Sequence, residues 1–147
     1  MNTWSNCGVY ISRDVLITTI NTIDDSFDFG ALHESVVLVY TASSCVEKDL
    51  YNFSNRLIEK NPLLIAYAGP LASFCFDCSL RLLAQLNPVE HIMTMHLESD
   101  SIEEVVADFL GSAWPSEERF GAWKSYSIFS LDEKMTVRIQ AAVAALQ

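Results

Sequence analysis

The stretch Val36-Val37-Leu38-Val39-Tyr40 begins a regular alternation of short apolar runs and amphipathic segments that extends to the end of the sequence. Similar runs occupy residues 63–67, 92–97 and 126–129. Each run precedes a segment whose apolar residues lie three and four positions apart, the spacing of one helix face. Parallel strands need such crossovers and, when buried on both faces, read as nearly continuous apolar runs. The sequence therefore predicts an α/β fold: a small three-layer sandwich with a mainly parallel sheet of four to five strands and helices on both faces.

Residues 1–35 follow this pattern less closely than the four β-α units of residues 36–147. The segment 15–23 is rich in Ile and Thr, and its β-branched residues favour an additional strand at the edge of the sheet. The alternative is a helix that begins after Asp14. A chain of 147 residues is expected to form a single domain.

Three capping boxes predict where helices begin. In a capping box, a Ser or Thr side chain bonds a backbone N–H three residues later, and a Glu or Gln at that later position reaches back. The pattern occurs at Ser44 with Glu47, at Ser101 with Glu104, and at Ser130 with Glu133.

Composition and charge limit the classes of partner. The chain has 9 Lys and Arg residues against 19 Asp and Glu residues, a formal net charge of −10, and half of its residues are apolar. This composition is typical of a globular protein, and the negative charge disfavours nucleic acid and anionic membranes as partners. The start of the sequence lacks a basic segment followed by an apolar one, so we expect no signal peptide and a cytoplasmic location. The four cysteines are then expected to be reduced.

Two cysteines and two histidines follow the spacing of a zinc finger, but their local patterns do not fit one. Cys75 and Cys78 lie on a helical stripe with Leu82, whereas His91 and His96 flank a strand pattern. Zinc needs four ligands in tetrahedral geometry, and residues five apart on a strand point to opposite faces. We therefore predict no metal and no other cofactor, with Cys75 and Cys78 as buried, unreactive thiols. The alternative interpretation is a thiol oxidoreductase that uses these two cysteines.

The carboxyl ends of the predicted strands define a candidate ligand crevice. Open α/β sheets bind ligands at this edge. His96 and Glu98 are the nearby acid/base pair, and a serine beside His96 would be needed for nucleophilic catalysis. This alternative is a small enzyme or ligand-binding domain. The residues expected around the crevice are Ser43, Ser44, Gly69, His96, Glu98 and Ser99.

The uneven distribution of charge favours a different function. Between Leu82 and Glu118 the sequence has eight acidic residues and no Lys or Arg. Acidic surfaces accelerate and orient the binding of basic proteins, and aromatic residues supply the desolvated contacts that hold a complex together. We therefore interpret the protein as an acidic protein-binding module rather than an enzyme, in its most specific form an immunity or inhibitor protein that covers a basic partner. The predicted partner-binding residues are Glu103, Glu104, Asp108, Trp114, Glu117, Glu118 and Trp123.

Residues 36–147 also resemble an uncharacterised family of small bacterial α/β domains of unknown function. The resemblance lies in Ala66-Tyr67-Ala68-Gly69 through Phe76-Asp77-Cys78, followed by Ile92-Met93-Thr94-Met95-His96 and Ile102-Glu103-Glu104-Val105. It implies a bacterial or phage origin and a common fold, and it implies no activity.

Overall fold

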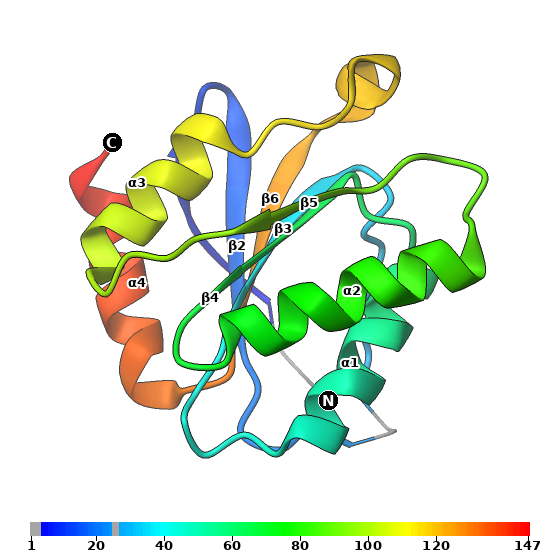
Figure 1. Ribbon diagram of the computed structural model, residues 1–147. Helices are drawn as coiled ribbons and strands as arrows, with labels where there is room; N and C mark the ends of the chain where they lie inside the picture. Colours follow the sequence, from blue (N-terminus) through cyan, green and yellow to red (C-terminus); the bar gives the residue numbers. More distant parts are fainter. Residues whose placement is uncertain (1–3, 25–26) are drawn as a thin grey trace.

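The computed structural model describes residues 4–24 and 27–147. Across these residues the chain forms a six-stranded sheet with the strand order β1-β2-β6-β3-β4-β5 (Figure 1). Strands β2, β6, β3, β4 and β5 run parallel to one another, and β1 is antiparallel to β2. The strands span Ser5–Tyr10 (β1), Arg13–Thr19 (β2), Ser35–Tyr40 (β3), Leu64–Ala68 (β4), Met93–His96 (β5) and Ser125–Ser130 (β6).

Helices cover both faces of this sheet. Helices α1 (Glu47–Glu59) and α2 (Ala72–Leu86) pack on one face, and α3 (Ile102–Ser112) and α4 (Glu133–Ala145) pack on the other (Figure 1). A short 3-10 helix, η1 (Glu117–Ala122), connects α3 to β6. The predicted three-layer α/β sandwich is confirmed, with six strands in place of four to five. Among the described residues, no helix combines the length and the apolar character needed to span a membrane.

The two strands before residue 36 form a hairpin that accounts for the higher strand count. β2 confirms the strand predicted within residues 15–23, but it lies between β1 and β6 instead of at the edge. The edge belongs to β1, whose side chains are exposed or partly exposed and therefore show no apolar run. Ile11 and Ser12 make the turn with positive φ angles of 47° and 66°. Turns of this kind usually contain Asn or Gly, so the dipeptide Ile-Ser carries no turn signal.

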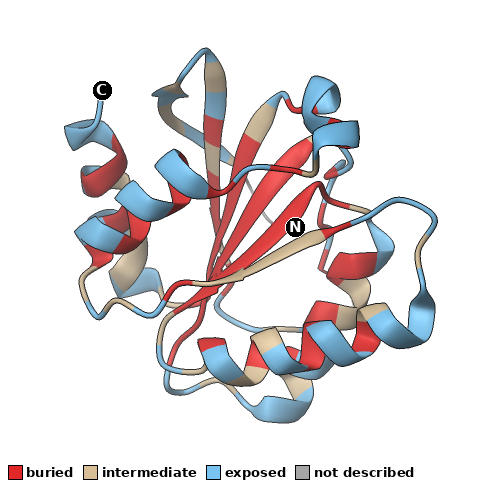
Figure 2. Ribbon diagram, turned by 45° about the horizontal axis from the view of Figure 1, so that its top comes forward, coloured by how far each residue is buried: buried red, intermediate tan, exposed pale blue. Residues whose placement is uncertain are grey.

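The buried residues form two cores, one on each face of the sheet. Figure 2 shows buried residues along the central strands and on the helices around them. On the α1–α2 face, residues 20–24 and 27–34, which lie between β2 and β3, form no helix. Phe27 and Phe29 pack against Phe53 of α1 and Phe129 of β6, with ring centroids between 5.0 and 6.1 Å apart. These edge-on and tilted aromatic contacts do the packing that a crossover helix would otherwise provide.

Of the three predicted helix starts, the capping bond forms at one. The Ser101 hydroxyl accepts a hydrogen bond from the Glu104 N–H at 3.3 Å and caps α3. The prediction for Ser44 is wrong, because Val46 precedes α1 and no side chain caps it. The prediction for Ser130 is also wrong: Asp132 caps α4, since its carboxylate accepts from the Lys134 N–H at 2.9 Å.

The crossovers leave an opening where the strands end. β3 leads into α1 on one face, whereas its neighbour β6 leads into α4 on the other face. The chain therefore separates beyond the carboxyl ends of these adjacent strands, which is where open α/β sheets bind ligands. Two hollows lie along this edge of the sheet.

Candidate functional site

The larger hollow lies beyond the carboxyl ends of β3, β4 and β5, has a volume of about 460 Å³, and is called the strand-end hollow below. Four of the six residues predicted for the crevice line it: Gly69, His96, Glu98 and Ser99. The prediction that Ser43 and Ser44 line this hollow is wrong. The loop after β3 turns away toward α1 and leaves both residues outside the lining. The complete lining consists of Tyr40, Gly69, Pro70, His96, Leu97, Glu98, Ser99 and Asp100.

Gly69 shapes the floor of the strand-end hollow. Its φ angle is +94°, and a Cβ atom at this position would lie 2.5 Å from the backbone oxygen of Thr41. The Thr41 hydroxyl donates to the Ala68 carbonyl at 3.1 Å and accepts from the Leu71 N–H at 3.0 Å. Only glycine fits both the backbone angle and the space, so the turn after β4 is pressed against the end of β3.

Tyr40 was missed by the sequence analysis because it belongs to an apolar strand run. It is 7% exposed, and its hydroxyl makes no hydrogen bond within the described part of the chain. Burial raises the pKa of Tyr40. Arg138 opposes this shift, while the carboxylates of Asp100, Asp132 and Glu103 add to it. The phenol therefore remains protonated.

The other polar groups of the strand-end hollow do not form a catalytic pair. His96 Nδ1 lies 3.7 Å from the Glu98 carboxylate, beyond hydrogen-bond distance, and the His96 ring stacks on Phe76 with centroids 5.9 Å apart. The Ser99 hydroxyl donates to Glu104 at 2.6 Å and accepts from the Ser101 N–H at 3.1 Å. Ser99 is thus occupied by the start of α3. Within the described residues, no serine is hydrogen-bonded to His96.

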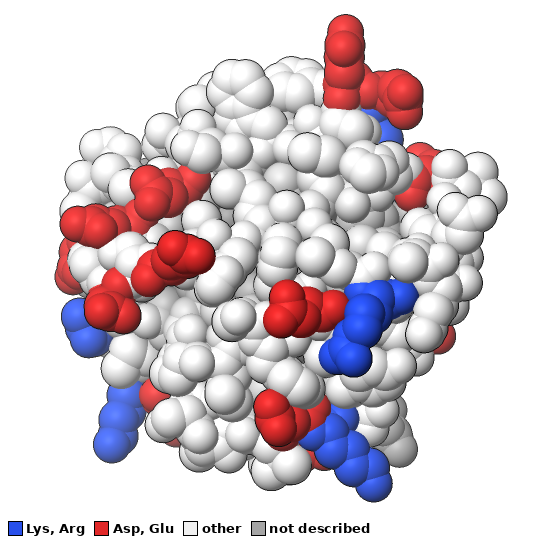
Figure 3. All heavy atoms as spheres, in the orientation of Figure 1, with Lys and Arg blue, Asp and Glu red and all other residues white. Residues whose placement is uncertain are grey.

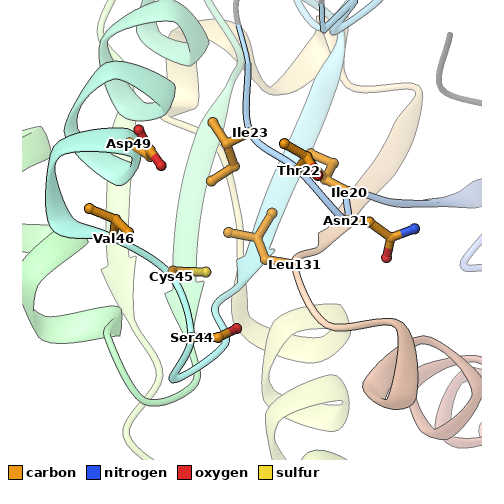
Figure 4. A pocket seen from close by; sticks show the side chains of 9 residues that line it. All are labelled: Ile20, Asn21, Thr22, Ile23, Ser44, Cys45, Val46, Asp49 and Leu131. Carbon is orange, nitrogen blue, oxygen red and sulfur yellow. The ribbon is translucent and has the colours of Figure 1, made fainter.

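A second, smaller hollow of about 160 Å³ lies at the switch point between β3 and β6 (Figure 4). Ile23 and Leu131 point toward its middle, and Cys45 and Asp49 line it from the loop after β3 and from α1. Ser44 lines this hollow. Its polar groups are separated by apolar side chains, so they do not converge on one point as a polar ligand would require.

The structure confirms that Cys75 and Cys78 are buried on α2. Burial raises the pKa of the Cys75 thiol to about 12, and the neighbouring Cys78 and Cys45 add to this shift. A reactive thiol has its pKa lowered instead, so the direction is opposite to that of a redox nucleophile. Among the described residues, no group of three or more His, Cys, Asp or Glu side chains is arranged to hold a metal ion.

Five acidic residues, Glu98, Asp100, Glu103, Glu104 and Asp108, extend along α3 and the loop before it, and we call them the acidic surface. Figure 3 shows acidic side chains gathered over this helix and loop. Within the described chain, no Lys or Arg lies within ion-pair distance of any of the five. The backbone N–H and the Ser101 hydroxyl hold the pKa of Glu103 below its usual value, so this carboxylate stays ionised.

The connection from α3 to β6 exposes a different aromatic pair from the predicted one. Trp114 is 56% exposed and lies in edge contact with Phe120, which is 43% exposed; we call this pair the aromatic cap. The prediction of Trp123 as a partner contact does not fit its burial. Its side chain is 6% exposed and packs on Tyr126 under the guanidinium of Arg13. Phe120 was missed because a single aromatic in a loop does not reveal which side faces solvent.

A buried arginine fixes the aromatic cap to the body of the protein. Arg119 donates to the backbone carbonyls of Asn61, Pro62 and His91 at 2.9 to 3.2 Å and pairs with Glu90 at 3.3 Å. These bonds hold η1 over the loops before β4 and β5. The predicted contact residues Glu117 and Glu118 are exposed on this anchored turn.

Comparison with protein-family models, curated proteins and solved structures finds no significant match. The resemblance to a family of small bacterial domains therefore stays a prediction. Conclusions about function depend on the geometry described above.

Proposed function

We propose that this protein binds a basic protein partner through the acidic surface of α3, with the aromatic cap as the apolar anchor. The observation that carries the proposal is the run of five exposed carboxylates from Glu98 to Asp108, none of which has a Lys or Arg within ion-pair distance in the described part of the chain. Unpaired like charges repel one another, and a basic surface relieves that repulsion. An immunity or inhibitor protein that covers the basic site of a toxin or nuclease is the most specific form of this proposal.

The two parts of the surface have different physical roles. Exposed charges steer a partner during approach and mainly change the association rate. A large aromatic side chain that becomes desolvated in the complex mainly slows dissociation. Trp114 follows α3 directly, so one partner can contact the acidic surface and the aromatic cap together.

Both parts are held rigidly, which lowers the entropic cost of binding. Helix α3 buries five side chains in the core of its face, and Arg119 fixes η1 through three backbone carbonyls. The recognition residues are therefore ordered before a partner arrives.

The test uses two triple charge reversals that change the net charge equally. Glu103→Lys, Glu104→Lys and Asp108→Lys alter the acidic surface; Glu47→Lys, Glu59→Lys and Asp77→Lys alter exposed acids of α1 and α2 on the opposite face. We expect a basic protein from the source cells, identified by mass spectrometry, to be retained by wild type and by the second variant and lost by the first. Equal retention by all three proteins would contradict the proposal.

Kinetics with the retained protein then separate the two roles. The α3 reversal should slow association and weaken its dependence on salt. Trp114→Ala should instead accelerate dissociation by a factor that corresponds to about 2 kcal/mol.

A second candidate function is the binding of a small ligand in the strand-end hollow. It is supported by the convergence of Gly69, His96, Glu98 and Ser99 on one hollow whose volume of about 460 Å³ lies in the range of small-molecule sites.

A further inference from the structure

The strand-end hollow presents more hydrogen-bond acceptors than the protein itself satisfies. Within the described residues, the Tyr40 hydroxyl and the Asp100 carboxylate make no hydrogen bond or ion pair. Glu98 has one polar contact, the 3.7 Å approach of His96, and its side chain is 83% exposed. Three oxygen-bearing groups therefore face one hollow with few donors, which selects a ligand rich in N–H groups.

The hydroxyl of the buried Tyr40, unpartnered within the described residues, distinguishes this hollow from an ordinary acidic surface. Two other tyrosines in the core use their hydroxyls: Tyr67 bonds Ser54 and Ser79, and Tyr126 donates to the Leu110 carbonyl at 3.1 Å. Tyr40 is more than nine-tenths buried, lines the hollow and has no such partner. Among the described residues, the fully buried side-chain oxygens without a partner are those of Thr18 and Ser116. The Tyr40 hydroxyl is not one of them, so it reaches the surface of the hollow and is available to a group that enters it.

We infer that the strand-end hollow receives the guanidinium group of an arginine side chain carried by the basic partner; the source of that side chain rests on the proposed function. A guanidinium has five N–H donors in a fixed plane, which suits several carboxylate and hydroxyl oxygens at once. It is also more weakly hydrated than an ammonium group and is therefore easier to desolvate. Pro70 and Leu97 in the lining offer apolar contact to the methylene groups of the side chain.

The charges around the hollow agree with a cation and disfavour an anion. Glu98 and Asp100 line it, and the electrostatic influence of Glu103 and Asp132 reaches the Tyr40 hydroxyl. Arg138 is the cation that acts on the same hydroxyl and opposes them. The two carboxylates in the lining, Glu98 and Asp100, disfavour a phosphate or carboxylate ligand.

The hollow is continuous with the acidic surface. Ser99 lines the hollow and donates to Glu104 of α3, and Ser101 both caps α3 and donates to Glu103. A partner that lies along α3 therefore passes the mouth of the hollow. One arginine from its basic surface can enter while other basic residues meet α3.

The experiment measures binding of a capped arginine, N-acetyl-arginine amide, to the full chain by NMR. We expect saturable shifts of the Gly69, Leu97 and Ser99 amide signals with a dissociation constant in roughly the millimolar range. N-acetyl-citrulline amide, which has nearly the same shape without the charge, should cause no saturable shift. Tyr40→Phe and Asp100→Asn should each weaken binding by about tenfold, because each removes one oxygen that accepts from a charged donor. Tyr51→Phe and Asp77→Asn, on α1 and α2, are the matched controls and should bind like wild type.

Three results would overturn the inference: no saturable shift at the three amides, equal shifts with citrulline, or unchanged affinity in both hollow variants. Because the probe needs no partner, its failure is separate from that of the proposed function. If capped arginine does not bind but a basic protein is captured in a way that depends on α3, only the arginine site in the hollow is rejected. Arginine binding without α3-dependent capture would reject the proposed function and leave a cation site.

Discussion

The two ends of α3 have opposite chemistry. Before its first turn lies the strand-end hollow, where the Tyr40 hydroxyl and the Asp100 carboxylate lack partners within the described residues. After its last turn lies the aromatic cap, backed by a buried Trp123 and by Arg119, whose donors reach three carbonyls and Glu90. At the aromatic cap the side chain of Arg119 finds its partners within the described part of the protein, whereas at the strand-end hollow the Tyr40 hydroxyl and the Asp100 carboxylate do not.

This difference separates structural from functional polar residues. A buried group that is fully hydrogen-bonded stabilises the fold, and its removal lowers the free energy of unfolding. A polar group that reaches solvent and has no partner within the protein adds little to stability, so its removal should show mainly in binding. Matched pairs of residues, one held in the fold and one exposed or open, test this difference.

The first comparison concerns the two tryptophans near the aromatic cap. Trp123→Ala should lower the free energy of unfolding by about 4 kcal/mol, because it empties a core site and removes the ring under Arg13. Trp114→Ala should change it by less than about 0.5 kcal/mol, because the side chain is 56% exposed. Urea unfolding of both variants measures the difference. Similar losses would show that Trp114 is part of the fold and is not a free anchor.

The second comparison tests the anchor of η1. Arg119→Met should reduce the free energy of unfolding by about 3 kcal/mol, because three backbone carbonyls lose their donors in one step. Arg138→Met removes an exposed arginine from α4 and should cost less than about 0.5 kcal/mol. Equal stability of the two variants, measured by urea unfolding, would mean that the aromatic cap is not held by Arg119.

The third comparison tests the floor of the strand-end hollow. Gly69→Ala should destabilise the protein by about 2 kcal/mol, because the added Cβ meets the Thr41 backbone and alanine disfavours a φ of +94°. Gly121→Ala is the control, since a Cβ there has nothing within 4 Å. Thermal unfolding distinguishes them. A neutral Gly69→Ala would show that the turn after β4 moves freely and that the hollow has no fixed floor.

Much of the fold was predictable because it rests on burial. Strand β3 is buried at every position, and α3 buries the five apolar residues that its spacing marks. Of the hairpin, β2 was predicted and β1 was not, because an exposed edge strand shows no apolar run. The Ile11-Ser12 turn between them also lacks the residues usual in such turns. The failed cap at Ser44 has a local cause: α1 begins one residue after Val46, three positions beyond the serine.

The site was predictable in its position but not in its polar detail. The rule that ligands bind at the carboxyl ends of strands located Gly69, His96, Glu98 and Ser99. Tyr40 could not be found in this way, because in the sequence it is the last apolar residue of a strand. Trp123 was predicted to be an exposed contact and is buried, whereas Phe120 was not predicted and is exposed. The exposure of an aromatic in a loop depends on contacts with distant residues such as Arg13, which the sequence does not reveal.

The smallest predicted effect is the most direct test of the difference between satisfied and open polar groups. Tyr67→Phe removes a hydroxyl that joins Ser54 and Ser79, so the free energy of unfolding should fall by about 1 kcal/mol. Tyr40→Phe removes a hydroxyl that has no partner in the described chain, so the change should lie within about 0.5 kcal/mol of zero. Both substitutions keep the ring, so apolar packing is preserved and chemical unfolding reports the hydroxyl alone. If Tyr40→Phe costs as much as Tyr67→Phe, the protein itself supplies a partner to the Tyr40 hydroxyl, and that hydroxyl is not available to a ligand. If Tyr40→Phe leaves the free energy of unfolding unchanged but weakens the binding of capped arginine, the hydroxyl serves to bind the ligand.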